Sequence, residues 1–213
     1  MSLAHHQLFI SIGPNPRLVR MCAEEKGLEI PETLVDLRGG ENRRDAYLKL
    51  NPGGQMPALR LPDGQVIAET LAICEYLEEL HPEPALIGSN PAERGETRMW
   101  LRRVENLYVR PMIDAYRYGP GLPLFANRMR CLPEAAPDLL LLAHDGEAWL
   151  NAQIGKGPYL AGARMTLADV MLFAFVDFAA MRNVMTLDPA HAALQPWFAR
   201  MAARPSAAAT LTV

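Results

Sequence analysis

The chain has 213 residues, of which 50% are hydrophobic, and a formal net charge of −3. This length suits one large or two small domains, and the hydrophobic content is ample for buried cores. Neither half of the chain is strongly basic, which excludes the cationic surface of a DNA- or RNA-binding protein. No apolar run is long enough to span a bilayer and the N-terminus lacks a signal pattern, so the sequence predicts a soluble, cytoplasmic protein without a membrane partner.

The three cysteines, Cys22, Cys74 and Cys131, are an odd number and lack the spacing of a zinc site. This pattern argues against a disulfide scaffold and against a bound metal, so we expect reduced thiols. Cys22 and Cys74 lie on apolar helical stripes, where a free cysteine is usually a small core residue.

The first fifty residues alternate between strand and helix signals. Residues 8–12 are an apolar run that predicts a strand, and a Gly-Pro-Asn-Pro turn then leads into a helix over residues 17–26. Gly27 is placed to cap the end of that helix. Residues 28–37 predict a second strand, and residues 38–50 predict a short helix or an irregular loop.

Residues 51–80 carry the most informative pattern of the chain. They begin with the turn NPGG, continue in an alternating strand over residues 56–61, and turn back at the letters PDG into a strand at residues 66–67. This pattern predicts an antiparallel hairpin. From residue 70 apolar residues recur at helical spacing, which predicts a helix that ends near residue 80. The resulting order, β-α-β-α-β-β-α, is the thioredoxin-like arrangement.

Two features of this stretch predict a ligand site. Pro57 opens a strand directly after Met56, and a cis bond between them would expose the Met56 backbone to a ligand. Glu69 and Thr70 stand where the second hairpin strand leads into the helix, so a carboxylate, a hydroxyl and free helix N–H groups converge. We interpret this corner as a receptor for a zwitterion. Taken singly, the proline and the threonine would more often be an edge-strand proline and a simple N-cap.

A proline-rich linker, HPEPALIGSN, covers residues 81–90 and leads into an all-helical part. Asn90 predicts the N-cap of a long helix that Pro111 should kink. We therefore predict a first domain at residues 1–80, this linker, and a helical bundle domain at residues 91–213.

The remaining helices follow from their apolar patterns. Residues 119–137 contain four prolines and two glycines, and predict an extended connection beside a pocket. A helix is predicted over residues 138–154, with the leucines 139–142 and Leu150 facing inward, and a last helix over residues 190–203. The terminal letters SAAATLTV predict a loosely held tail.

Thr166 and Asp169 belong to a capping-box pattern, TLAD, in which each side chain can bond the backbone N–H of the other residue. The helix that this box opens is apolar almost all round from residue 170 to residue 180, which predicts the buried centre of the second domain. We interpret the motif as structural.

Several motifs together resemble the cytosolic glutathione transferases. NPxGxxPxL, a following DG turn and an acid–hydroxyl pair that opens a helix are similar to the glutathione-binding domain of that family. The string YLAGxxxTLAD closely resembles the capping motif that transferase C-terminal domains share. The resemblance extends over nearly the whole chain. It implies a thioredoxin-like domain followed by a helical bundle, glutathione as co-substrate, and a two-fold homodimer.

The resemblance also implies that glutathione lies extended along the first domain. The backbone before the proline would pair with its cysteine, and the helix start would take its γ-glutamyl carboxylate, with the acid near its ammonium group. A glutamine and an arginine are expected at its glycine end, where each is otherwise an exposed polar side chain. The residues assigned in this way are Gln55, Met56, Pro57, Glu69, Thr70 and either Arg43 or Arg44.

The reaction requires a thiolate, because a thiol is a poor nucleophile and a cysteine thiol titrates at about 8.5. Gly13 stands where the family usually has an activating serine, cysteine or threonine, and Phe9 stands where a tyrosine would be. A helix end supplies only about 0.3–1 kcal/mol at exposed sites, whereas each pKa unit requires about 1.4 kcal/mol. A further donor is therefore needed. Ser11, on the same strand face as Gly13, and Asn15, at the helix entrance, are the candidates, and Asn15 is equally suited to capping its helix.

The pocket for the electrophile is expected beside the long helix of the second domain. Aromatic and methionine side chains make an adaptable apolar wall. We predict Tyr108, Met112 and Tyr116 as lining residues, each of which is otherwise a packing residue of its own domain.

The sequence supports three functional hypotheses. The first is a glutathione S-transferase, in which bound glutathione thiolate adds to, or substitutes on, a small apolar electrophile. The second is a glutathione-dependent disulfide reductase or peroxidase, because the Pro14-Asn15 pair resembles the TPN segment of the bacterial Nu-class enzymes. The third is a non-catalytic glutathione-binding or scaffold protein, which Gly13 favours and the intact glutathione motif opposes. Glutaredoxin-like chemistry is disfavoured, since it needs a cysteine where Gly13 stands.

Overall fold

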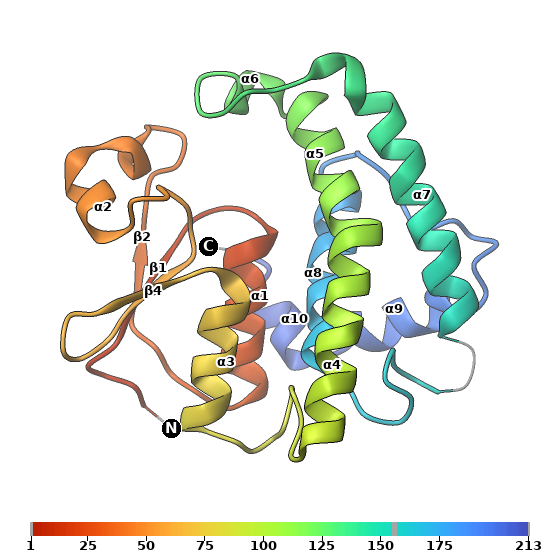
Figure 1. Cartoon of the computed structure of the whole chain (residues 1–213), viewed down its shortest axis with the longest axis horizontal. Helices are drawn as coiled ribbons and strands as arrows, with labels where there is room; N and C mark the ends of the chain where they lie inside the picture. The colour runs from red at the N-terminus through yellow and green to blue at the C-terminus, as the bar shows by residue number, and fades with distance from the viewer. Residues whose placement is uncertain (1, 155–156, 213) are drawn as a thin grey trace. The chain divides into compact units, whose positions relative to one another are not determined.

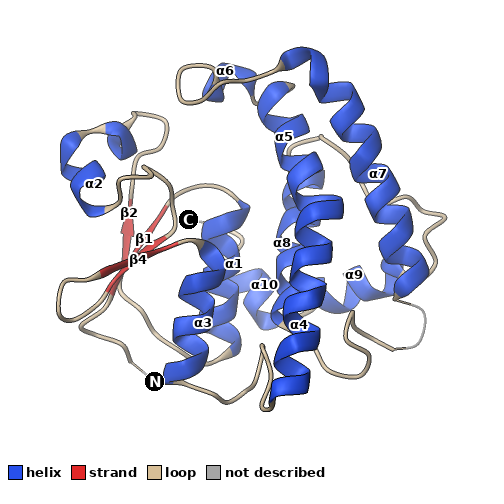
Figure 2. Cartoon of the chain, in the orientation of Figure 1, coloured by secondary structure: helices blue, strands red, loops and turns tan. Residues whose placement is uncertain are grey.

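The computed structural model describes residues 2–154 and 157–212 (Figure 1). Contacts divide the chain into two compact units, Met1–Leu86 together with Ala203–Val213, and Ile87–Ala202. Figure 2 shows that the first unit carries the sheet and that the second is built from helices and their connections. Within the described ranges, no helix combines the length and the apolar character needed to cross a membrane.

The first unit follows the predicted order of strands and helices. Its elements are β1 (Gln7–Ile10), α1 (Pro14–Glu25), β2 (Glu32–Leu34), the 3-10 helix η1 (Glu41–Arg43), α2 (Asp45–Leu50), β3 (Ala58–Arg60), β4 (Val66–Ala68) and α3 (Thr70–Leu80). The strand order is β2-β1-β3-β4, with β1 and β2 parallel and the other two pairs antiparallel. This topology confirms the thioredoxin-like fold.

The strand β1 places alternate side chains on the two faces of the sheet. Leu8 and Ile10 are buried, whereas Phe9 points to the other face and packs against a cluster that includes Tyr47 and Met56. Helices α1 and α3 contact each other (Figure 1), and their apolar stripes contain the free thiols of the two core cysteines. Both of these thiols, on Cys22 and Cys74, are buried as predicted. Burial raises the pKa of the Cys74 thiol above its ordinary value.

Two details of the first unit differ from the sequence prediction. Helix α1 begins at Pro14 rather than at residue 17, because a proline needs no N–H partner in the first turn. In α3 the apolar Leu80 is 42% exposed, whereas the charged Glu78 is buried and pairs with the Lys26 ammonium at 2.6 Å, the reverse of what residue type favours. The periodicity could not foresee this because the partner lies on another helix.

The sequence predicts a loose C-terminal tail that belongs to the helical unit, and the structure corrects both points. Its short helix α10 (Pro205–Ala209) packs against α1 in the first unit. The carboxylate of Glu25, at the end of α1, accepts hydrogen bonds from the guanidinium of Arg204 and the hydroxyl of Ser206. Arg17 of α1 donates to the Ala207 carbonyl at 3.2 Å. These bonds between distant parts of the chain hold the tail.

The second unit consists of helices that enclose one buried helix. Its elements are α4 (Pro91–Val104), the π-helical turn η2 (Glu105–Val109), α5 (Arg110–Tyr118), α6 (Leu122–Phe125), the 3-10 helix η3 (Pro133–Ala135), α7 (Ala136–Gln153), α8 (Leu167–Met181) and α9 (Leu194–Ala202). Asn90 caps α4 as predicted, since its side chain accepts a hydrogen bond from the Glu93 N–H at 3.0 Å. Nearly all of α8 is buried, which confirms it as the centre of this unit.

The long helix passes Pro111 by way of the π-helical turn. Proline has no N–H to bond the carbonyl four residues earlier, and a π turn accommodates the missing bond. That carbonyl belongs to Leu107 and faces Gly146 of α7, where an added Cβ would lie only 1.9 Å from the oxygen. The two helices thus approach as closely as a glycine allows. On α7, Leu150 is buried as predicted, but Leu141 and Leu142 are 63% and 53% exposed, which corrects the inward orientation expected for them.

The predicted capping box of α8 is present and buried. One carboxylate oxygen of Asp169 accepts hydrogen bonds from the N–H and the hydroxyl of Thr166, at 2.9 and 3.1 Å. The other accepts from the Leu160 N–H at 2.9 Å and from the Trp197 indole at 3.0 Å. Burial raises the pKa of the Asp169 carboxyl, and these donors oppose the rise. The aspartate therefore joins α8, α9 and the preceding loop.

Candidate functional site

The starts of helices α1 and α3 meet in the first unit. The hydroxyl of Thr70, the first residue of α3, donates a hydrogen bond to the side-chain oxygen of Asn15 at 3.2 Å. Both residues are half-buried. The structure thus brings together two residues that the sequence placed at separate helix starts.

The start of α3 is open. Glu69 occupies the N-cap position with φ 71°, and no side chain caps this helix. A positive φ costs a residue with a side chain about 1 kcal/mol or more, and such a conformation persists only where its surroundings hold it. The first N–H groups of a helix have no partner within the helix, and they carry the positive end of its dipole. A carboxylate ligand fits this corner.

The start of α1 offers fewer backbone donors than most helix starts. Pro14 and Pro16 have no N–H, so in the first three positions Asn15 alone keeps a backbone donor. Gly13 precedes them with φ 130°, a conformation that residues with a Cβ rarely adopt, although the space around it is open. A serine at position 13 would therefore be strained in this backbone conformation, so Gly13 differs from the family's usual residue in its backbone as well as in its side chain. Among residues 13–16, Asn15 alone has a polar side chain.

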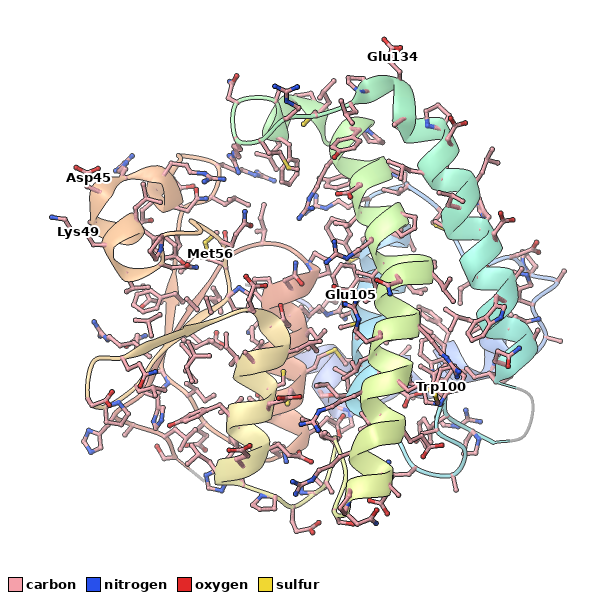
Figure 3. All side chains as sticks on the ribbon, in the orientation of Figure 1. Asp45, Lys49, Met56, Trp100, Glu105 and Glu134 are labelled. Carbon is pink, nitrogen blue, oxygen red and sulfur yellow. The ribbon has the colours of Figure 1, made fainter. Side chains whose placement is uncertain are left out.

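The loop before β3 presents a free backbone. The bond between Met56 and Pro57 is cis, as the sequence suggested. The Met56 side chain packs inward with Val35 and Tyr47, and within the described ranges no turn or loop hydrogen bond uses the Met56 backbone. Figure 3 shows Met56 near α2, whose charged residues Asp45 and Lys49 point away from it. The peptide groups on either side of Met56 can therefore pair with an extended ligand.

The two residues expected at the glycine end of the ligand lie on the same side of this unit. Gln55 directly precedes Met56 and its side chain is exposed. Arg43 is exposed as well, and an added Cβ at Gly54 would lie 3.0 Å from its guanidinium, so the arginine reaches the loop. Arg44 instead donates to the Gly39 carbonyl at 3.3 Å. Of the two arginines, Arg43 is the one beside the loop.

Ser11 is not placed to donate to a ligand. It is only 2% exposed, and its hydroxyl donates to the Val35 carbonyl at 2.8 Å. The side chain that sequence reasoning placed on the face of Gly13 thus ties the end of β1 to the chain after β2. Its proton is committed, so of the two candidate donors only Asn15 remains.

The residues predicted for the electrophile pocket have different surroundings in the helical unit. Tyr108 and Met112 are 1% and 0% exposed and belong to the core, and burial raises the pKa of the Tyr108 hydroxyl. They are packing residues. Tyr116 is half-buried, and its ring lies edge-on to Phe178 with the centroids 5.1 Å apart. Of the three, Tyr116 alone keeps accessible surface.

Comparison with known proteins identifies the family of this chain. Residues 12–80 match the family model "Glutathione S-transferase, N-terminal domain", and residues 133–200 match "Glutathione S-transferase, C-terminal domain". Glutathione S-transferase 2 of Saccharomyces cerevisiae is 30% identical over 201 residues, which cover 91% of this chain and 84% of the yeast protein. The chain therefore belongs to the glutathione S-transferase family.

Solved structures support the same assignment. A glutathione S-transferase domain-containing protein from Marinobacter aquaeolei is 32% identical and superposes with a TM-score of 0.86, covering 94% of this chain and 99% of that one. A glutathione transferase homologue from Sulfitobacter, solved with bound glutathione, shares the fold at a TM-score of 0.79 with 24% identity, covering 97% and 96% of the two chains. Glutathione binding is thus a property of a structural relative.

Proposed function

We propose that the protein is a glutathione S-transferase in which bound glutathione thiolate attacks a small apolar electrophile. The observation that carries this proposal is the hydrogen bond from Thr70 to Asn15, which joins two open helix starts at one corner. One start suits a carboxylate and the other suits a thiolate, and glutathione bears both groups.

Glutathione would lie extended along the loop and the start of α3. Its γ-glutamyl carboxylate meets the first N–H groups of α3 and Thr70, and its ammonium group meets the exposed carboxylate of Glu69. Its cysteine pairs with the free backbone of Met56 beside the cis Pro57. At the other end, its glycine carboxylate reaches the guanidinium of Arg43 and the side-chain amide of Gln55.

Asn15 would stabilise the thiolate. Because Thr70 donates to its side-chain oxygen, the two N–H donors of the same amide point elsewhere and can reach an anion. Lowering a thiol pKa by two units requires about 2.7 kcal/mol. A helix start contributes about 0.3–1 kcal/mol, and a hydrogen bond to a charged group contributes about 1.5–3 kcal/mol. The helix and the amide together are sufficient, without a serine at Gly13.

The chemical step then needs little else from the protein. The thiol proton passes to solvent, and the sulfur forms a bond to the electrophilic carbon. In substitution a leaving group departs with the bonding electrons, and in addition the neighbouring atom takes a proton. Tyr116, the one predicted lining residue that keeps accessible surface, is our candidate to contact the electrophile. We further propose that the enzyme acts as a cytoplasmic homodimer, as its resemblance to the cytosolic transferases implies.

The pH dependence of kcat/KM with an aryl chloride tests this proposal. In the wild-type protein the rate should rise with an apparent pKa well below about 8.5, which is the thiolate of bound glutathione. Asn15→Ala should move that pKa upward by about one unit or more and lower the rate at neutral pH about tenfold. Asn15→Asp, which adds a negative charge, should have a larger effect. An unchanged pKa in both variants would remove Asn15 from the mechanism.

Disulfide reduction or peroxide reduction is the second candidate, and the amide donor of Asn15 beside Pro14 favours it. The same variants distinguish the two reactions when glutathione mixed disulfides or hydroperoxides replace the aryl chloride. Faster turnover of those oxidants would assign the second activity. Glutathione binding without turnover of either class would assign the non-catalytic role.

A further inference from the structure

The carbonyl of Gln55 accepts two hydrogen bonds that the proposed mechanism does not use. The hydroxyl of Tyr47 donates to it at 2.7 Å, and the side-chain amide of Asn51 donates at 2.8 Å. This carbonyl and the N–H of Met56 belong to one peptide group, and a peptide group is planar. In a trans peptide the two bonds point in opposite directions. Holding the oxygen from one side therefore directs the Met56 N–H to the other side.

The rest of the loop is closed by short hydrogen bonds. The Gly54 N–H donates to the Asn51 carbonyl at 2.9 Å, and the Gly53 N–H donates to the Asn51 side-chain oxygen at 3.1 Å. From η1, Asn42 donates to the Gly54 carbonyl at 2.7 Å. Gly54 has φ 60°, which lets the chain turn back on itself. The peptide between Gln55 and Met56 is thus fixed by its neighbours before any ligand arrives.

Tyr47 is itself held firmly. It is 6% exposed on α2, and its ring packs edge-on against Phe9, with the centroids 6.2 Å apart, and beside Met56. Burial raises the pKa of its hydroxyl to about 12, so the hydroxyl remains a donor throughout the working pH range. One side chain therefore packs against the side chain of Met56 and also orients the peptide that precedes it.

We propose that Tyr47 and Asn51 are positioning residues for glutathione, which act by aiming the Met56 N–H at the backbone carbonyl of the bound cysteine residue. This inference rests on the proposed function, because it concerns the same site. Neither residue touches the ligand. Their effect is to preorganise the backbone donor, so that less order is lost on binding.

Calorimetric titration with reduced glutathione tests the inference. Tyr47→Phe removes one hydroxyl and keeps the packed ring, and it should weaken glutathione binding about 3- to 10-fold. The matched control is Tyr76→Phe, which removes a hydroxyl bonded to His6 at 2.9 Å elsewhere in the same unit, and it should leave the affinity unchanged. Asn51→Ala should act like Tyr47→Phe. Equal affinities in the wild-type protein, Tyr47→Phe and Asn51→Ala would overturn the proposal.

A readout without ligand separates positioning from general destabilisation. Amide hydrogen exchange at Gly54, whose N–H donates to the Asn51 carbonyl in the same loop, should quicken in Tyr47→Phe, while amides in α1 and α3 stay protected and the unfolding temperature moves no more than in Tyr76→Phe. The double variant should lose more affinity than the product of the two single losses, because it leaves the Gln55 carbonyl without a donor. Unchanged exchange in Tyr47→Phe together with strictly multiplicative losses would contradict a shared role.

The two proposals fail in different ways. If the wild-type protein does not bind glutathione, the proposed function is wrong, and the positioning inference falls with it. If the wild-type protein binds and both single variants bind equally well, only the positioning inference is wrong.

Discussion

Helices α3 and α8 each begin at a threonine or beside one, with an acidic residue close by in sequence, but the two starts differ in hydrogen bonding. At α8, Thr166 and Asp169 bond each other, and the same aspartate also accepts from Leu160 and Trp197. All of this lies in the buried core of the helical unit. Such a start has satisfied its donors and stabilises the fold.

At α3 the corresponding groups are left open. Glu69 is exposed at φ 71° and caps nothing, and Thr70 turns its hydroxyl to Asn15 on another helix. The N–H groups of the first turn have no side-chain cap. Similar residue types therefore serve stability where the chain folds over them, and we propose that they serve ligand binding where it leaves them exposed. Substitutions at the two starts should separate these roles.

The largest effect is expected at the closed start. Asp169→Ala removes the acceptor of Thr166, Leu160 and Trp197 together, and buried donors left without a partner are costly. We expect the free energy of unfolding in urea to fall by about 3 kcal/mol or more. Asp145→Ala, at an exposed position of α7, should change it by less than about 0.5 kcal/mol. A similar small loss in both variants would mean that the capping box contributes little.

The next effect concerns the far end of α1, whose start has no side-chain cap. Burial by itself raises the pKa of Glu25, but hydrogen bonds from Arg204 and Ser206 outweigh it and hold the pKa below its usual 4.5. A lowered pKa in the folded state stabilises the protein above about pH 4.5, and this contribution disappears as the pH falls through the folded pKa. Glu25→Gln should cost about 2 kcal/mol at neutral pH.

Denaturant titrations of the wild-type protein and Glu25→Gln across pH measure this contribution. The difference between the two should be constant from neutral pH down to about pH 4.5 and shrink below it. A difference that persists undiminished in acid would place the loss in packing rather than in the charge.

A smaller effect is expected at the open start of α3, and there it concerns ligand binding rather than stability. Thr70→Val should weaken glutathione binding about tenfold, because the site loses the hydroxyl and the orientation of Asn15, and it should leave unfolding nearly unchanged. Thr166→Val is the matched variant at the closed start, and it should lower stability by about 1 kcal/mol while glutathione affinity stays the same. Calorimetry gives the glutathione affinity of each variant, and urea unfolding gives its free energy of unfolding. If Thr70→Val lowers stability as Thr166→Val does, the two starts are alike.

The smallest catalytic effect is expected at Ser11. Its hydroxyl is committed to the Val35 carbonyl, so Ser11→Ala should leave kcat/KM within about twofold and cost about 1 kcal/mol of stability. Loss of a donor to the reacting thiolate would instead lower the rate about tenfold or more, as expected for Asn15→Ala. Steady-state kinetics of Ser11→Ala with an aryl chloride therefore decide whether the Ser11 hydroxyl helps Asn15 to stabilise the thiolate.

Much of the fold could be predicted because its signals lie in short stretches of chain. Turn residues located the hairpin before α3, Asn90 located the start of α4, and the letters TLAD located the buried helix α8. The predicted core role of Cys22 and Cys74 followed from apolar periodicity. Periodicity alone could not orient the run of leucines in α7, since Leu141 and Leu142 are apolar but exposed.

The candidate site was predicted in part for the same reason. Met56, Pro57, Glu69 and Thr70 follow one another within a single hairpin and helix, so their spacing predicts a joint role. The sequence did not predict that Tyr108 is only a core residue, nor that the Tyr47 hydroxyl holds the Gln55 carbonyl. Both roles depend on residues that surround these side chains in the folded chain. For Tyr47 a signal was present in its position just before the NPGG turn, but the acceptor of its hydroxyl could not be read from it.

Local chain chemistry alone decided where helices and turns begin and where a proline removes a donor, because these properties depend on neighbouring residues. It also predicts which corner can receive a zwitterion. Contacts between distant residues decided which polar groups are occupied. Ser11 is bonded to Val35, Thr70 to Asn15, and Glu25 to Arg204, each across a gap in sequence that no local pattern spans. A hydrogen bond satisfies a donor only when its acceptor is near, and folding determines that distance.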